Sequence, residues 1–303
     1  MKFGVCIPNF GEKLSPASIR SVCESAESLG YDSAWTTDHL VTPPGASSPY
    51  RNILESVSVL AYAAATTRRI SIGSSIIVLP LRDPVLLAKQ LATIDQLSGG
   101  RLIVGLAVGW SEEEFTALGS NFHDRGSRAN EEIDLLRELW TQPVVDHIGR
   151  HYKIRDVAFE PKPAQGGSLP IWIGGNSLSA VRRAAAYGNA WHATSIPFDE
   201  FQGGVRELRK LAHRREVQAT ARMAIDLRLK ETKLTTNPAG ERRVLLGGRE
   251  DGAVRSIKEY ETAGLEYLVA YFGDKEREAY LADMEEFAAF AFPTFKRTIT
   301  EPR

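Results

Sequence analysis

The stretch "LPIWIGGNSLSAVRRAAAYGNAWHATS", residues 169–195, contains two apolar strands with one helix between them. Residues 169–175 and 190–195 are apolar enough to be buried strands, and residues 178–187 have the pattern of a helix. Ser177 stands directly before that helix, where an N-cap residue is favoured. Because parallel strands need a crossover connection, this order of strand, helix and strand predicts a parallel sheet.

The same alternation extends through the rest of the chain. Further apolar strands are predicted at residues 2–8, 33–37, 69–78, 99–109, 221–230 and 266–272. Helices are predicted at 16–29, 53–66, 84–97 and 275–290. Eight strands with helices between them fit a (β/α)8 TIM barrel better than an open sheet, and the chain length suits one.

Two segments interrupt the alternation. The main insertion covers about residues 111–168, with a helix at 127–140 and a hairpin or extended excursion at 144–163. A second polar insertion covers about 231–248. We therefore expect one barrel domain over residues 1–303 with two insertion segments.

Composition excludes several classes of protein. The formal net charge is −1, so the chain lacks the excess of basic residues that would indicate a nucleic-acid partner. Cys6 and Cys23 are the two cysteines, and their placement predicts buried thiols in a reducing cytoplasm rather than disulfides or a zinc cluster. Residues 1–10 do not form a signal peptide, and no apolar run approaches about 20 residues, so neither secretion nor membrane insertion is expected.

In a barrel of this class the active site lies at the C-terminal ends of the strands. The second strand ends in Asp38 and His39, and the set of strand ends as a whole is rich in Gly, Ser and aromatic residues but poor in acids. Metal-dependent barrel hydrolases need several His and carboxylate ligands there, so that class is disfavoured. The spacing of His147 and His151 is compatible with zinc on a helix, but Gly149 argues against a helix.

Residues Gly174, Gly175, Asn176 and Ser177 form the clearest ligand-binding pattern. Two glycines allow close approach, and the capped helix that follows presents free N–H groups and a positive dipole end to a phosphate. An ordinary strand-to-helix turn explains the same residues equally well. His39 has a similar alternative, since a histidine at a strand end often bonds only to backbone. Trp110 follows Gly109 at a strand tip and is placed to cover a flat ligand, whereas Trp35 and Trp172 lie within apolar strands and are expected in the core.

Three motifs together resemble the bacterial luciferase-like monooxygenase superfamily, and most closely its probable coenzyme F420-dependent oxidoreductases. They are "WTTDHL" at residues 35–40, the block from Ile72 to Gly119, and residues 169–195. The resemblance covers nearly the whole chain in order. It implies a barrel with insertion segments and a flavin or deazaflavin as the redox centre.

The resemblance also assigns roles to individual residues. His39 matches a histidine near the cofactor ring, and Ser75 and Ile76 match a non-prolyl cis peptide behind the ring. Independently of the resemblance, we expect Asp38 either to orient His39 and fix its tautomer or to cap the following loop. The strand tip with Ala107, Gly109 and Trp110 matches the lining of the ring pocket, and Gly174 to Ser177 match the phosphate loop. Some dehydrogenases of the group have a Glu where this chain has Trp110, which argues against a sugar-phosphate dehydrogenase mechanism here.

The function implied is hydride transfer between reduced coenzyme F420 and a small organic substrate. The alternative is a reduced-FMN monooxygenase served by a separate reductase, and a third possibility is a non-catalytic flavin-binding barrel. Arg51, Arg125 and Arg128 are candidates to bind the acidic tail of the deazaflavin. A cytoplasmic protein is expected, and relatives of this kind commonly form homodimers.

Overall fold

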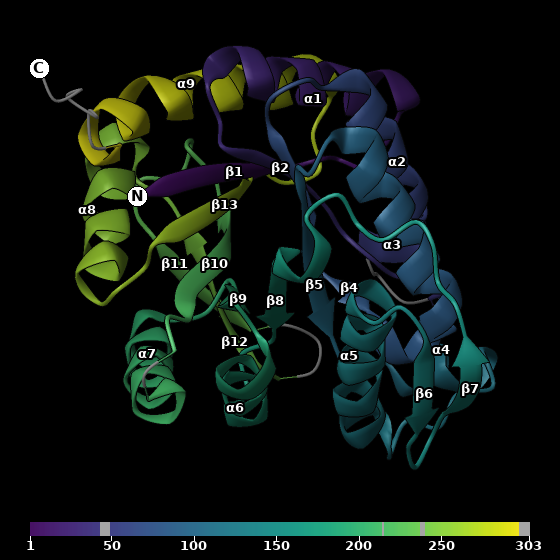
Figure 1. Ribbon diagram of the computed structural model, residues 1–303. Coiled ribbons are helices and arrows are strands. Elements are labelled where there is room, and N and C mark those ends of the chain that lie inside the picture. The colour runs from purple at the N-terminus through teal and green to yellow at the C-terminus, as the bar shows by residue number, and fades with distance from the viewer. Residues whose placement is uncertain (43–48, 214, 237–239, 297–303) are drawn as a thin grey trace, which may run out of the picture.

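Eight parallel strands form a closed barrel in the computed structural model, which describes residues 1–42, 49–213, 215–236 and 240–296 (Figure 1). The last strand pairs with the first, and this closure confirms the predicted (β/α)8 class. In spatial order the strands are β1 (Lys2–Cys6), β2 (Ser33–Thr36), β3 (Ser71–Ser74), β5 (Leu102–Ala107), β8 (Ile171–Gly174), β9 (Ala190–Thr194), β10 (Gln218–Ile225) and β13 (Tyr267–Tyr271).

Helices surround the barrel on the outside (Figure 1). They are α1 (Pro16–Leu29), α2 (Ser56–Thr66), α3 (Pro84–Ser98), α5 (Arg125–Thr141), α6 (Leu178–Tyr187), α7 (Phe198–Ala212), α8 (Arg249–Thr262) and α9 (Arg277–Phe295). Local sequence sets several of their starts: the Asp83 side chain accepts from the N–H of Leu86, and Pro84 occupies the first turn. Among the described residues, no helix is both long and apolar enough to cross a membrane.

The two irregular segments have secondary structure of their own. Between β5 and β8 lie α4 (Glu112–Ala117), α5, the antiparallel pair β6 (Val145–Ile148) and β7 (Lys153–Val157), and a 3-10 turn η3 (Gly166–Ser168). Between β10 and α8, β11 (Lys233–Thr236) pairs antiparallel with β12 (Arg242–Leu246). Strand β12 also pairs with the end of β10, so this segment extends the barrel wall on one side.

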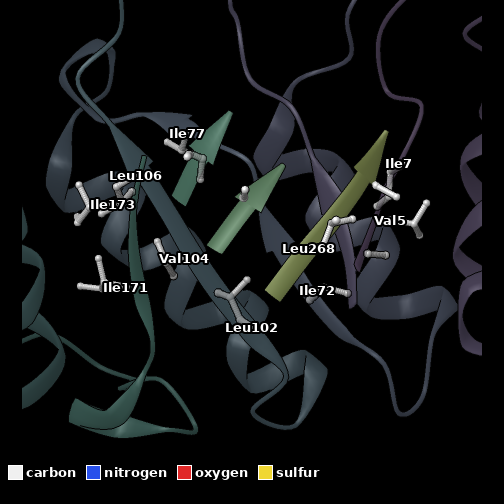
Figure 2. Close-up of a cluster of buried hydrophobic side chains, with 14 of the residues drawn as sticks. Val5, Ile7, Ile72, Ile77, Leu102, Val104, Leu106, Ile171, Ile173 and Leu268 are labelled. Atoms are coloured by element: carbon white, nitrogen blue, oxygen red, sulfur yellow. The ribbon is translucent and has the colours of Figure 1, made fainter. Parts of the chain in front are cut away.

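Apolar side chains fill two separate layers. The outer layer lies between the strands and the helices, and Figure 2 labels several of its members, among them Val5, Ile72 and Val104. The inner layer fills the barrel itself and includes Cys6, Trp35, Trp172, Tyr267 and Val269. Alternate residues of each strand thus face opposite layers, as the pleat of a strand requires.

Trp35 lies beside Trp172 in the barrel interior and is fully buried. Its ring centroid lies 4.6 Å from that of Trp172 and 5.6 Å from that of His192. Gly4 and Gly73 on the flanking strands face the indole, and a Cβ atom at either position would lie about 2.4–2.5 Å from it. The prediction that Trp35 and Trp172 belong to the core is confirmed.

Several predicted boundaries are wrong by two residues or more, and three of them have an identifiable local cause. The strand expected at 69–78 is interrupted by a cis peptide between Ser75 and Ile76 and continues as β4 (Ile77–Val78), ahead of the short turn η2 (Leu79–Leu81). The helix expected from residue 53 begins at Ser56, because the Glu55 side chain accepts from the N–H groups of Val57 and Ser58. The strand expected to reach residue 230 ends at Ile225, where a turn closed by the Leu229 N–H begins.

One buried carboxyl group on α5 lacks a complete set of partners. Glu132 accepts a hydrogen bond from the Tyr152 hydroxyl, while its Oε2 atom has no partner within the described residues. Burial raises the pKa of Glu132 to about 7. The folded protein therefore holds a proton here that the unfolded chain releases at a lower pH.

This pKa predicts a pH-dependent loss of stability. Between the ordinary pKa of 4.5 and about 7, the unfolded chain ionises at Glu132 and the folded protein does not, so stability falls as pH rises through that window. The loss is about 2–3 kcal/mol from pH 5 to pH 8 at about 1.4 kcal/mol per pKa unit. Urea unfolding at both pH values should show this loss in the wild type and in the control Glu24→Gln, but not in Glu132→Gln. Equal pH dependence in all three proteins would contradict the assignment.

Candidate active site

Aromatic rings gather where the barrel strands end. Phe10 follows β1, Tyr50 lies in the 3-10 turn η1 (Pro49–Arg51), Trp110 follows β5 and Tyr271 ends β13; we call these four residues the aromatic wall. Their ring centroids are 5.1 Å apart for Phe10 and Tyr50 and 5.3 Å apart for Phe10 and Tyr271. Trp110 has 62% of its surface exposed. The C-terminal mouth of the barrel therefore presents flat apolar surfaces.

His39 lies within this wall and is held by Glu114. Its ring centroid is 4.4 Å from that of Tyr50 and 5.5 Å from that of Trp110. Its Nδ1 atom is 3.0 Å from Oε2 of Glu114, and the other Glu114 oxygen accepts from the N–H of Leu40 at 2.6 Å. The structure thus brings His39 and Trp110 together, as the sequence predicted, and adds Glu114 to them.

The charge on Glu114 decides the tautomer of His39. Burial alone would raise the pKa of Glu114, but the hydrogen bonds from His39 and from the backbone outweigh it and the pKa falls below its ordinary value. An ionised carboxylate only accepts hydrogen bonds, so the His39 nitrogen that faces it, Nδ1, must carry the hydrogen. The Nε2 atom is then the one through which His39 gains or loses a proton.

Asp38 does not orient His39, and that prediction is wrong. Its Oδ2 accepts from the Val78 N–H at 2.8 Å and from Arg82 Nη1 at 2.7 Å, and its Oδ1 accepts from Arg82 Nη2 at 2.8 Å. Burial raises the pKa of Asp38 and the Arg82 ion pair opposes that effect. Successive residues of an extended segment point to opposite sides, so Asp38 reaches β4 and His39 reaches the mouth.

The cis peptide between Ser75 and Ile76, predicted from the family resemblance, is present. The Ile76 side chain lies against two glycines inside the barrel: a Cβ atom on Gly174 would be 1.5 Å from its Cδ1, and one on Gly105 would be 2.9 Å from its Cγ2. Gly174 is therefore required for packing against Ile76. From the sequence, close approach of a ligand and an ordinary strand-to-helix turn explain this glycine equally well.

A chain of hydrogen bonds from the barrel interior holds the Ser75 side chain in place. Burial lowers the pKa of His192 to about 3, so its ring is neutral. Its Nδ1 lies 2.8 Å from the Thr220 hydroxyl, which itself donates to the Trp191 carbonyl, and its Nε2 lies 2.9 Å from the Ser75 hydroxyl. The hydrogen therefore sits on Nδ1, and Ser75 donates to Nε2.

The side chains of the predicted phosphate loop are engaged within the protein. Asn176 bonds both the N–H and the carbonyl of Thr194, and Ser177 caps α6 by accepting from Ala180. Gly175 has a φ of +121° and donates its N–H to the His192 carbonyl. A phosphate at this loop would accordingly be bound by backbone N–H groups at the start of α6.

The remaining predicted residues have structural contacts as well. Ala107 pairs with Val78 of β4, and a Cβ atom on Gly109 would meet Val78 and Phe115. These contacts, and not the aromatic wall, determine the positions of Ala107 and Gly109. Arg125 donates to the carbonyls of Gly109 and Phe122.

Arg128 pairs with Asp124, which leaves Arg51 as the exposed member of the three predicted cations. His147 lies between Glu131 and Glu138, and no group of His, Cys, Asp and Glu in the described part of the chain is arranged to hold a metal ion.

Two residues of the mouth were missed by sequence reasoning. Glu114 is one of three consecutive glutamates at the start of a short helix, and nothing in that run distinguishes it. Arg222 lies in a strand that alternates regularly, and it is almost fully buried although arginine is mostly an exposed residue. Its position on the inward face of a predicted barrel strand is the sequence feature that indicates a buried arginine.

Fold and site together define a (β/α)8-barrel enzyme. The family model for luciferase-like monooxygenases matches residues 1–233, and the protein belongs to that family. The resemblance inferred from the sequence motifs is thereby confirmed.

Individual relatives differ in their cofactor. The F420-dependent glucose-6-phosphate dehydrogenase of Amycolatopsis mediterranei (strain U-32) is 25% identical over 320 aligned positions, covering 91% of this chain and 94% of that protein. The FMNH2-dependent dimethylsulfone monooxygenase of Pseudomonas putida is 32% identical over 209 positions, covering 64% of this chain and 56% of that protein. In fold, the F420-dependent tetrahydromethanopterin reductase of Methanopyrus kandleri superposes with a TM-score of 0.79 at 19% identity, over 97% of this chain and 99% of that one.

The contact between Glu114 and His39 predicts the effect of Glu114→Gln. The amide keeps the size of the side chain but loses the charge, so it no longer holds the His39 hydrogen on Nδ1, and stability should fall by about 1–3 kcal/mol. Nitrogen-15 NMR of the imidazole should show the Nδ1–H tautomer in the wild type and an increased share of Nε2–H in the variant. Glu113→Gln, on the exposed side of the same helix, is the control. An unchanged tautomer in Glu114→Gln would overturn the assignment.

Proposed function

We propose that the protein transfers a hydride between reduced coenzyme F420 and a small organic substrate. The observation that carries the proposal is His39, fixed by Glu114 and flanked by Tyr50 and the exposed ring of Trp110 at the barrel mouth. The match to an F420-dependent dehydrogenase over 91% of the chain supports the same choice of cofactor.

The residues of the mouth fit a flat redox cofactor with a phosphate. The aromatic wall offers ring faces to a planar molecule, and the exposed start of α6 offers backbone N–H groups and the positive end of a helix dipole to the phosphate. When bound, the deazaflavin ring would accept or supply the hydride.

The protein's own residues supply the proton chemistry and the positioning. Glu114 holds Nδ1 of His39, so Nε2 is available to exchange a proton with the substrate as its charge changes. Asp38 and Arg82 anchor β4 directly after the cis peptide, which keeps the backbone behind the ring in place. Trp110 and Tyr50 would exclude water from the reacting atoms.

A reduced-FMN monooxygenase with a separate reductase is the second candidate. It is favoured by the 32% identity to the dimethylsulfone monooxygenase and by Trp110, which stands where some F420-dependent dehydrogenases resembling this chain have a glutamate. A non-catalytic flavin carrier would keep the same mouth but would show no turnover of the bound ring.

Titration of the cofactor-free protein with each cofactor, followed by fluorescence, separates these functions. We expect tight binding of F420 and weaker binding of FMN. The acidic tail of F420 leaves the mouth past exposed Arg51, so its affinity should fall with added salt more steeply than that of FMN. Tight FMN binding without detectable F420 binding would make the monooxygenase the leading function.

Replacement of His39 tests the proposed proton transfer. His39→Ala removes no contact of the barrel core, so the protein should fold, and the rate of hydride transfer should fall by about 10²–10⁴. The change in cofactor absorbance measures that rate. His123→Ala, a histidine on an exposed loop, should react like the wild type. A wild-type rate in His39→Ala would leave His39 with a structural role.

A further inference from the structure

Arg222 is a buried cation inside the barrel. It lies on β10, in register with Thr194 of β9 and Val269 of β13, and only 6% of its surface is exposed. Its Nη1 atom is 3.1 Å from the Thr37 hydroxyl and 3.4 Å from the Ser75 carbonyl oxygen, to which it donates. Both partners follow the C-terminal ends of strands, so the guanidinium lies at the mouth.

Arg222 differs from other buried cations of the described chain in its charge environment. Within the described residues, no carboxylate forms an ion pair with Arg222, whereas the half-buried Arg82 pairs with both Asp38 and Glu55. The neighbouring groups are neutral: burial raises the pKa of the Cys6 thiol and of the Tyr271 hydroxyl. An arginine stays protonated in proteins, and an unpaired buried charge is costly. The described residues around Arg222 therefore leave one positive charge uncompensated, which an anionic ligand would balance.

The surroundings of Arg222 suit the apolar part of an organic molecule. Its Cζ atom lies 4.8 Å from the ring centroid of Tyr271 and 5.5 Å from that of Phe10. The hydrogen bonds to Thr37 and Ser75 both come from Nη1, and the Cys6 side chain is a further hydrogen-bond partner of the guanidinium. A guanidinium has five N–H donors, so part of the planar fork is left for a ligand. Phe10 in turn contacts Tyr50, and Tyr50 contacts His39. A row of rings thus connects the uncompensated cation to the proposed proton donor.

We propose that Arg222 binds the anionic group, a carboxylate or a sulfonate, of the substrate. Its fork would bind two oxygen atoms of that group, while Phe10 and Tyr271 contact the adjoining carbon skeleton. The groups that Arg222 contacts follow or end β1, β2, β3 and β13, whereas the cofactor phosphate is proposed at the start of α6, between β8 and β9. We therefore assign Arg222 to the substrate rather than to the phosphate. This assignment rests on the proposed function only in taking the bound anion to be the substrate.

Matched small probes test the assignment without knowledge of the substrate. Benzoate and benzenesulfonate should bind the wild-type protein at least about tenfold more tightly than neutral benzamide, at equal ionic strength and followed by calorimetry. Arg222→Gln should lose that preference while its affinity for F420 or FMN stays within about threefold of the wild type. Failure to bind either cofactor would contradict the proposed function, and equal binding of charged and neutral probes by the wild type would overturn the role of Arg222.

Two further variants keep the result interpretable. Arg222→Lys retains the charge but not the fork, so it should keep a reduced preference for the anionic probes. Arg101→Gln removes a half-buried arginine at the opposite end of the barrel, which donates to the carbonyls of Ala64 and Ile70, and should lower the melting temperature without changing the preference. If Arg222→Gln does not fold, the role of Arg222 is still tested by the relative affinities of the wild type and Arg222→Lys for the anionic and neutral probes. The assignment is overturned if Arg222→Gln still prefers the anionic probes to benzamide. It is also overturned if Arg222→Gln loses affinity for the cofactor and not for the anionic probes.

Discussion

The interior of a closed eight-stranded barrel has room for few large side chains, and Trp35 lies at the centre of the contacts between them. That one indole determines what its neighbours are. Gly4 and Gly73 give it space, and Trp172 and His192 pack against its faces. His192 then bonds to Ser75, the first residue of the cis peptide. The packing of the core and the shape of the backbone at the mouth are thus one continuous set of contacts.

Asp38 and His39 are neighbours in the sequence but have different partners at the barrel mouth. Asp38 is committed to Arg82 and the backbone of β4, where it stabilises the strand that follows the cis peptide. His39 is committed to Glu114 and faces the aromatic wall. Asp38 and His39 are adjacent in the sequence, yet the structural ion pair and the group proposed to exchange a proton have separate environments.

The sequence predicts the barrel well because its evidence is local. Apolar strands, N-cap residues such as Ser177 and the glycines after helices each reflect a few neighbouring residues, and all of them agree with the barrel. The active-site contacts are non-local: Glu114 meets His39 across 75 positions of the chain. Asp38 is adjacent to His39 in the sequence but not its partner, because successive residues of an extended segment point to opposite sides. Arg222 was overlooked because its burial becomes apparent only when the strands close around it.

Glu114 also has a consequence for how this scaffold can be modified. Its carboxylate accepts from the backbone N–H groups of Leu40 and Val41, so α4 clamps the segment that leaves β2. These two segments belong to different strand–helix units, yet the hydrogen bonds of one carboxylate join them. Loop grafting between relatives, a common route to new catalysts on barrels, would therefore have to transfer both segments as a single module.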